Sequence, residues 1–214
     1  MRDNRNYIYS SGEVSMREEF KHIARWIKYG SSVIDLGCGD GTLLLLLKEK
    51  KNIKVADGIE IVKSGVIASR KKGLNVWQGK IDVSLNKTKD KTYDYAICNV
   101  TLQMVMYPEI LISEMKRISS KQIISFPNFA FILNRIELLL KARMPRSMIP
   151  GYEWYSTGHI HQLSILDFVD YCKKNDINIL DQDNIYPSRC FYIPKQILLL
   201  FPNLFTRTSL FLTS

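Results

Sequence analysis

Short apolar runs and helical patterns alternate along the chain from Ser32 to Phe126, and this alternation constrains the fold more than any other feature. Apolar runs bounded by turn residues indicate strands, whereas apolar side chains three and four positions apart indicate helices. The expected strands cover residues 32–36, 53–61, 74–77, 93–99 and 121–126, and the expected helices cover 42–50, 62–72 and 108–118. Strands that alternate with helices predict a parallel sheet with helices on both faces, an α/β architecture.

Both flanks of this region add further elements. The sequence predicts helices at 17–29, 130–142 and 164–175, and two more strands at 177–185 and 209–213, one of them antiparallel. The chain has 214 residues and shows no repeat, Gly/Ser linker or low-complexity tract, so we expect a single domain over 1–214. Within it, residues 127–163 are expected to form a lid or partner insertion before the last strands.

The charge balance is strongly basic. Thirty Lys and Arg residues against 21 Asp and Glu give a formal net charge of +9, while a hydrophobic content of 46% excludes a wholly disordered chain. Such a charge is compatible with nucleic acid, a membrane surface, an acidic protein partner or a Lys-rich solvated surface. The cations are dispersed over predicted helix ends and loops, which argues against nucleic acid and leaves an acidic protein partner or a Lys-rich surface.

The cysteines and apolar runs argue against metal and membrane functions. Cys38, Cys98, Cys172 and Cys190 form no CxxC pair and no Cys/His cluster, so we expect reduced, buried thiols and no metal site. The polar N-terminus has no apolar signal region, and the aliphatic run Leu43–Leu47 is too short to cross a bilayer. Pro and charged residues interrupt 193–212, which is expected to be packed core, and a cytoplasmic protein is predicted.

The motif that carries chemistry is a glycine loop between the first strand and the next helix. Gly37 allows a sharp turn, Gly39 lets the backbone approach a ligand, and Gly41 lets the helix pack close to the sheet. Asp35 precedes this turn, where a carboxylate suits an ammonium group better than a pyrophosphate. Glu60 ends the second strand, where an acidic side chain can bind two ribose hydroxyls.

This combination resembles the class I S-adenosylmethionine-dependent methyltransferases. The resemblance implies a Rossmann-like, mostly parallel seven-stranded sheet that binds S-adenosylmethionine or S-adenosylhomocysteine. It implies cofactor contacts from the loop, from the ends of strands two and four, and from the segment after strand three: Asp35, Gly37, Cys38, Gly39, Gly41, Glu60, Asp82 and Asn99. In that superfamily an Asp often follows Gly after strand three, whereas here Lys80 follows Gly79 and Asp82 comes two residues later.

Motifs beyond the loop resemble the methionine biosynthesis protein MetW family. They are Asn75-Val-Trp-Gln-Gly79, Thr101-Leu-Gln103, Ser125-Phe-Pro-Asn-Phe129, Arg143-Met-Pro145, Tyr152-Glu-Trp-Tyr155, Ile160-His161, Asp167-Phe168 and Asn203-Leu-Phe205. The resemblance covers the chain from about Val33 to its end. It implies a role in methionine biosynthesis as a partner and activator of homoserine O-acetyltransferase (MetX), and it leaves methyl transfer itself open.

The insertion is expected to fold over the carboxyl ends of the strands, where α/β proteins bind ligands. Its substrate or partner candidates are Pro127, Asn128, Glu153, Trp154, Tyr155 and His161. The aromatic side chains could stack on a ligand, anchor a protein interface or fill a structural gap. No catalytic residue is assigned, and His22 and His159 are expected to be structural or surface residues.

Three functions follow from these features. The first is an accessory protein of methionine synthesis that senses S-adenosylmethionine or S-adenosylhomocysteine. The second is an active methyltransferase that acts on a small molecule. The third, nucleic-acid methylation, rests only on the net charge, and the stretch Asn99–Leu102 lacks the Asn/Asp-Pro-Pro-aromatic run of many nitrogen methyltransferases.

Overall fold

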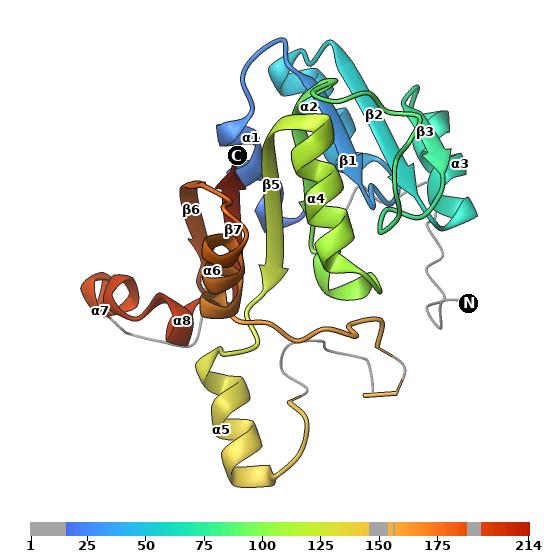
Figure 1. Ribbon diagram of the computed structural model, residues 1–214. Helices are drawn as coiled ribbons and strands as arrows, with labels where there is room; N and C mark the ends of the chain where they lie inside the picture. The colour runs from blue at the N-terminus through green and yellow to red at the C-terminus, as the bar shows by residue number, and fades with distance from the viewer. Residues whose placement is uncertain (1–15, 146–153, 156, 188–193) are drawn as a thin grey trace.

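A seven-stranded sheet forms the centre of the protein. The computed structural model describes residues 16–145, 154–155, 157–187 and 194–214. The strand order is β3-β2-β1-β4-β5-β7-β6 (Figure 1). The strands are β1 (Ser32–Leu36), β2 (Val55–Glu60), β3 (Asn75–Gln78), β4 (Tyr93–Asn99), β5 (Ser119–Pro127), β6 (Ile179–Ile185) and β7 (Thr208–Thr213).

Neighbouring strands from β3 to β5 are parallel, as the alternating sequence pattern predicts. Strand β7 lies between β5 and β6 and is antiparallel to both. This confirms the prediction of a mostly parallel sheet with one antiparallel strand among the last two. Because β7 returns the chain into the sheet, all of its residues are buried although it ends the chain.

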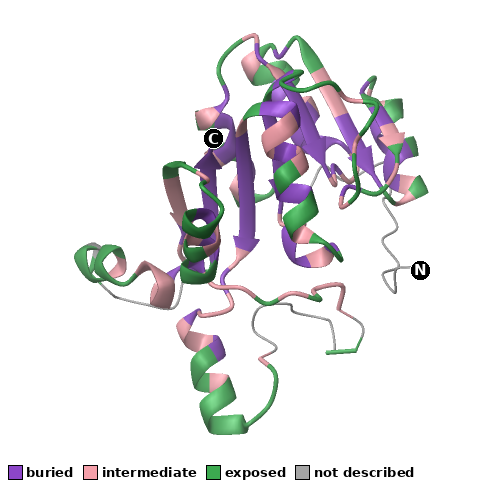
Figure 2. Ribbon diagram, viewed as in Figure 1, coloured by how far each residue is buried: buried purple, intermediate pink, exposed green. Residues whose placement is uncertain are grey.

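Helices cover both faces of the sheet. They are α1 (Glu18–Trp26), α2 (Thr42–Lys51), α3 (Lys63–Lys71), α4 (Pro108–Ile118), α5 (Ile132–Lys141), α6 (Ile165–Lys174), α7 (Lys195–Leu200) and α8 (Pro202–Phe205), with a 3-10 turn, η1 (Leu102–Met104). One core joins the sheet to α1, α2 and α3, and a second joins it to α4 and α6. The central strands are therefore buried on both sides (Figure 2), as expected of parallel strands between helical layers.

Local signals explain where several helices begin and end. Helix α4 starts with Pro108 in its first turn and finishes at Ile118, in agreement with the predicted bounds. Helix α6 begins with a capping box, in which Ser164 and Asp167 each accept a hydrogen bond from the other's backbone N–H. The predicted strand 53–61 is shorter in the structure and ends on Glu60.

The segment before β7 differs from the packed core that the sequence predicts. Ile197, Leu199, Leu200 and Phe201 are 41%, 61%, 71% and 56% exposed. The apolar side chains Ile197, Leu199 and Leu200 of α7 are exposed, whereas every residue of β7 is buried, so β7 enters the core and α7 does not. The prediction of packed core is wrong for α7 and correct for β7.

The described part of the 127–163 region lies at the carboxyl end of β5. Helix α5 projects beyond that end (Figure 1), and Asn134 is the buried residue of the helix. Residues 157–163 return toward the sheet, where Ile160 and His161 donate backbone hydrogen bonds to the carbonyl of Gln103.

No helix in the described ranges is long and apolar enough to cross a membrane. Cys38, Cys98 and Cys172 are free and buried, as predicted for reduced thiols, and Cys190 lies outside the described residues.

Candidate functional site

The glycine loop follows β1 and lies beside the ends of β2 and β4. Gly37, Gly39 and Gly41 have φ values of +85°, +58° and +76°, in the left-handed region that favours glycine. The backbone N–H of Gly37 donates to the carbonyl of Ile59 at 2.8 Å. A Cβ on Gly37 would lie 2.8 Å from Cγ2 of Thr101, so the loop after β4 closes directly on this turn.

The loop also packs tightly on α3. A Cβ on Gly65 would lie 2.7 Å from the carbonyl oxygen of Gly39, and a Cβ on Gly41 would lie 2.5 Å from Leu74. The hydroxyl of Ser69 donates to the carbonyl of Gly39 at 3.1 Å. Sequence reasoning missed Gly65, although a glycine inside a helical pattern is a recognised sign of close packing.

Glu60 fixes the loop from the end of β2. Its two carboxylate oxygens accept hydrogen bonds from the backbone N–H groups of Gly39 and Val62, each at 2.8 Å. The side chain is 5% exposed. Each carboxylate oxygen has a second lone pair, so the side chain can still accept from ligand hydroxyls while it holds the loop.

Asp35 is the electrostatically unusual residue of the site. Its side chain is 3% exposed, and its Oδ1 atom is buried without a hydrogen-bond partner. Burial, followed by the charge of Glu60, raises the pKa of Asp35 to about 7, against a smaller opposing effect of Arg17. A buried polar atom without a partner is costly in an apolar setting. Among the residues that the structure describes, none donates a hydrogen bond to this oxygen.

A polar cluster at the start of α2 was not anticipated from the sequence. Asp40 accepts hydrogen bonds from the ammonium of Lys72 at 2.7 Å and from the hydroxyl of Thr42 at 2.7 Å. Burial alone would raise the pKa of Asp40, but the bonds from Lys72 and Thr42 outweigh it and lower the pKa. The ion pair joins the glycine loop to the end of α3. Its two residues are 32 positions apart, so no local sequence pattern predicts it.

Asn99 lies at the end of β4, as predicted, and is 9% exposed. Its Oδ1 accepts a 2.6 Å hydrogen bond from Ser125 at the end of β5. Val100 follows with φ of +55°, an unusual conformation for a β-branched residue. The backbone N–H of Val100 donates to the carbonyl and hydroxyl oxygens of Ser125, at 3.1 and 3.0 Å, which stabilises this conformation.

The remaining predicted cofactor residues are Asp82, after β3, and Cys38, within the glycine loop. Asp82 accepts a 2.9 Å hydrogen bond from the backbone N–H of Met106, so it joins the segment after β3 to the segment after η1. Lys80 is exposed. Cys38 is 7% exposed and packs against Gly58; burial, then the charges of Asp35 and Glu60, raise the pKa of its thiol. Cys38 is therefore a protonated packing residue of the loop.

Among the described substrate or partner candidates, Pro127 and His161 both hydrogen-bond to Gln103, and Trp154 contacts Tyr155. Trp154 and Tyr155 are 76% and 66% exposed, with their rings edge to face at a centroid distance of 5.6 Å. Pro127 is half-buried at the end of β5, where its carbonyl accepts from Gln103 at 3.1 Å. His161 lies 3.3 Å from the carbonyl oxygen of Met106. Glu153 lies outside the described residues.

Asn128 does not belong to a surface, which corrects its assignment as a substrate or partner residue. It is 0% exposed. Its amide nitrogen donates to the carbonyls of Asn203 and Thr206 at 3.0 Å, and its oxygen accepts from the N–H groups of Ala130 and Ile165. The side chain is fully used within the fold.

Gln103 organises the segment that covers the ends of β4 and β5. It is 1% exposed, and its side chain contacts the carbonyl of Pro127 and Nδ1 of His159, at 3.1 and 3.0 Å. Its carbonyl accepts from Ile160 and His161. His159 is thus part of a structural network, as expected, and so is His22, which lies 2.6 Å from Asp183.

The described residues contain no group of His, Cys, Asp or Glu side chains that could hold a metal ion. The site instead combines a left-handed glycine turn, a buried carboxylate without a partner and a second carboxylate at the end of β2. These groups suit a ligand that carries an ammonium group and vicinal hydroxyls.

Known structures with the same fold are S-adenosylmethionine-dependent methyltransferases. One, from Mesorhizobium loti, has a TM-score of 0.67 and 13% identity over 94% of this chain and 99% of its own. Another, magnesium protoporphyrin IX methyltransferase from Synechocystis PCC 6803 with bound S-adenosylhomocysteine, has a TM-score of 0.61 and 15% identity, over 92% and 81%. At these identities the likeness establishes the fold, which confirms the predicted class I methyltransferase architecture.

Sequence comparison gives a more specific relationship. The chain is 28% identical over 196 residues to the bifunctional methionine biosynthesis protein MetXA/MetW of Rhodopirellula baltica. That alignment covers 87% of this chain and 31% of the relative, so the chain spans about a third of the relative's length. The family described as "Methionine biosynthesis protein MetW" matches residues 17–213. The chain therefore belongs to the MetW family, within a methyltransferase fold.

Proposed function

We propose that this protein binds S-adenosylmethionine or S-adenosylhomocysteine and acts in methionine biosynthesis as a partner of homoserine O-acetyltransferase. The observation that carries the first half is the unpartnered Oδ1 of Asp35 beside the glycine turn. Both cofactor forms carry an amino-acid ammonium group, which such an oxygen can accept. Membership in the MetW family and the MetXA/MetW relative support the second half.

Each proposed contact follows from the geometry of the chain. Asp35 accepts the ammonium group, and the backbone around Gly39 allows close approach because no Cβ intervenes. Glu60 accepts the ribose hydroxyls with the lone pairs that remain free after binding Gly39 and Val62. When bound, S-adenosylmethionine supplies an activated methyl group. We propose that Asn99, at the end of β4, and Asp82, which accepts from Met106, also contact the cofactor.

Calorimetric titration tests the cofactor site. S-Adenosylmethionine and S-adenosylhomocysteine are titrated into the intact protein and into Gly39→Val, Asp35→Asn and Glu60→Gln. We expect binding to the intact protein, loss of detectable binding in Gly39→Val because of its φ of +58°, and weakening of about tenfold or more in the other two. Asp170→Asn, on the exposed surface of α6, is the control and should bind as the intact protein does.

The absence of any heat with the intact protein would overturn the cofactor proposal. Equal binding by Asp35→Asn and the intact protein would leave a cofactor site and remove Asp35 from it.

The partnership is tested with the homoserine O-acetyltransferase encoded in the same genome. We expect the two proteins to elute together in size-exclusion chromatography and the acetyltransferase rate to change when this protein is added. The acetyltransferase rate is then measured with and without S-adenosylmethionine or S-adenosylhomocysteine. A rate that changes with either compound indicates a sensor, and an unchanged rate indicates a subunit whose effect does not depend on the cofactor. Two proteins that neither associate nor affect the rate would contradict the partnership.

Methyl transfer to a small molecule is the second candidate, and the polar Asn99–Ser125 pair beside the loop favours it. Incubation with S-adenosylmethionine labelled in the methyl group and a metabolite extract should then give a labelled product. Cofactor binding without any label transfer would assign the site to sensing.

A further inference from the structure

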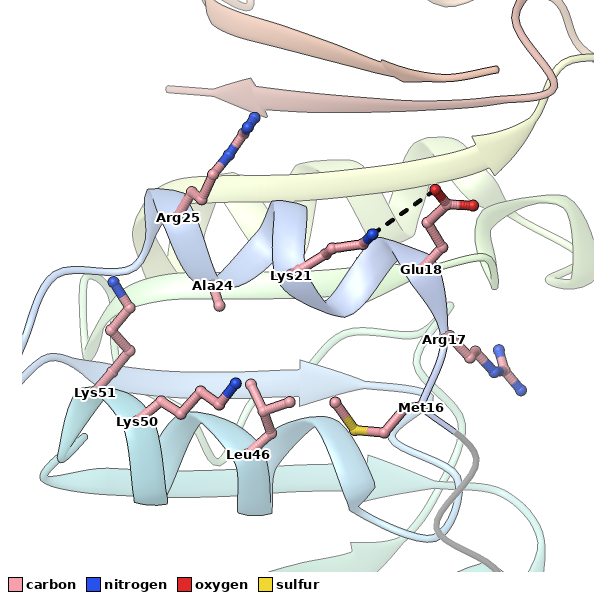
Figure 3. A pocket seen from close by; sticks show the side chains of 9 residues that line it. All are labelled: Met16, Arg17, Glu18, Lys21, Ala24, Arg25, Leu46, Lys50 and Lys51. Atoms are coloured by element: carbon pink, nitrogen blue, oxygen red, sulfur yellow. Dashed lines mark ion pairs between the residues drawn. The ribbon is translucent and has the colours of Figure 1, made fainter. Parts of the chain in front are cut away.

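A basic groove runs between α1 and α2 on one face of the molecule. It has a volume of about 480 Å³, and its lining residues are Met16, Arg17, Glu18, Lys21, Ala24, Arg25, Leu46, Lys50 and Lys51. Helix α1 supplies one wall and the last turns of α2 supply the other (Figure 3). We call this feature the α1–α2 groove.

Positive charge dominates its rim. Five cationic side chains line it against one carboxylate, that of Glu18, which already lies 3.9 Å from Lys21. Arg25 contacts Asp183 on β6. Within the described part of the chain, Arg17, Lys50 and Lys51 form no ion pair. Three of its five cations therefore have no ion-pair partner among the described residues, and the groove carries a net positive charge.

The floor of the groove is apolar. Met16 is 59% exposed. Ala24 on α1 and Leu46 on α2 line the groove and are 8% and 7% exposed. A free phosphate or a nucleic-acid backbone would use the cations but would leave this floor uncovered. Glu18 and Glu19 in the first turn of α1 also oppose an anion at that helix end. A peptide segment with one apolar edge would cover the apolar floor, and acidic side chains on both sides of that edge would pair with the basic rim.

The shape favours a helix as the bound segment. Two helices that lie side by side form a trough into which the ridge of a third helix can pack. The apolar edge of an amphipathic helix would cover Met16 and Leu46, and its acidic flanks would face Lys21 and Arg25 on one side and Lys50 and Lys51 on the other. Such an arrangement is electrostatically complementary along both edges.

We infer that the α1–α2 groove is the docking surface for an acidic amphipathic helix of a partner protein, and that homoserine O-acetyltransferase supplies this helix. The second clause rests on the partnership proposed above. Five of the 30 basic residues line this groove, so the docking surface accounts for part of the net charge of +9.

Matched charge reversals test this surface. Lys50 and Lys51 lie in the last turn of the ten-residue helix α2, and Lys173 and Lys174 lie in the last turn of the ten-residue helix α6. The double variants Lys50→Glu/Lys51→Glu and Lys173→Glu/Lys174→Glu change the net charge equally and oppose the helix dipole equally. Circular dichroism and thermal unfolding establish that both fold, and interferometry measures their affinity for the purified acetyltransferase.

We expect the α2 variant to bind about tenfold more weakly or worse, and the α6 variant to bind within about twofold of the unaltered protein. Raising the NaCl concentration from about 50 to about 500 mM should weaken the unaltered complex and have less effect on the α2 variant. Equal binding by the two variants, or an affinity that salt does not change, would overturn the groove while leaving the partnership intact. A lack of binding by the unaltered protein would overturn both.

Discussion

At the scale of single residues, Asp35 shows that a folded protein can contain a carboxyl group whose burial is energetically unfavourable. Its carboxyl is buried at the end of β1, with one oxygen unpartnered. A buried carboxyl that is raised in pKa marks sites of binding or catalysis more often than sites of packing. Its burial without a partner for Oδ1 lowers the stability of the free protein.

The first prediction concerns pH. The pKa of Asp35 is about 7 in the folded protein against 3.8 for an ordinary aspartate carboxyl, so between these pH values folding takes up a proton. The contribution of Asp35 to stability is therefore intact below about pH 4 and is lost as pH rises through about 7. Relative to Asp35→Asn, the unaltered protein should lose up to about 4 kcal/mol between pH 4 and 8, measured by urea unfolding without ligand. A difference in the free energy of unfolding between the unaltered protein and Asp35→Asn that does not change with pH would contradict the raised pKa of Asp35.

The second prediction concerns Gly65. Replacement of a helical glycine by alanine ordinarily stabilises a protein by up to about 1 kcal/mol. Here the new methyl group would meet the carbonyl of Gly39 at 2.7 Å, so Gly65→Ala should lower the free energy of unfolding by about 1–3 kcal/mol and weaken cofactor binding. Gly79→Ala is the control, because its nearest contact is an ordinary 3.5 Å to Ile59. Stabilisation by Gly65→Ala would show that the loop and α3 separate easily.

At the scale of elements, Asn128 joins segments that no local pattern connects. It links the end of β5 to the start of α6 through Ile165 and to the α8 region through Asn203 and Thr206. The Asn128 side chain thereby supplies hydrogen bonds to buried backbone groups that regular secondary structure does not pair here. This joint positions the chain as it leaves the sheet and as it returns to β7.

The third prediction follows from this joint. Asn128→Ala removes hydrogen bonds to buried backbone groups, so the free energy of unfolding should fall by about 2–4 kcal/mol. The matched control is Asn175→Ala at the end of α6, which removes a single exposed bond to Tyr171 and should cost less than about 0.5 kcal/mol. Both values are measured by urea unfolding. Similar losses in the two variants would show that Asn128 is not a joint.

At the scale of the whole molecule, α1 contacts the last strands of the sheet. Its apolar face packs in the same core as α2, and its polar side chains reach the edge strand β6. His22 and Arg25 both contact Asp183, and Trp26 donates to Asp181 at 2.8 Å. The first helix therefore stabilises the strand that lies at the edge of the sheet.

The fourth prediction tests this connection. Asp183→Ala should lower stability by about 1 kcal/mol and increase amide hydrogen exchange in both α1 and β6, because the two elements lose a shared contact. Asp170→Ala, an exposed carboxylate on α6, should change neither quantity. Exchange that increases in β6 alone would show that α1 is held by its apolar face only.

The parallel sheet, the position of the glycine loop and the family of the chain could all be predicted from the amino-acid sequence. These rest on local information: apolar runs bounded by turn residues, apolar side chains three and four positions apart, and glycines where the backbone takes positive φ. The packed structure was needed to show that Glu60 binds the loop amides, that Lys72 pairs with Asp40, and that Asn128 is buried between segments. These contacts join residues 21, 32 and 78 positions apart, so their existence depends on how the strands and helices pack and not on any pattern along the chain.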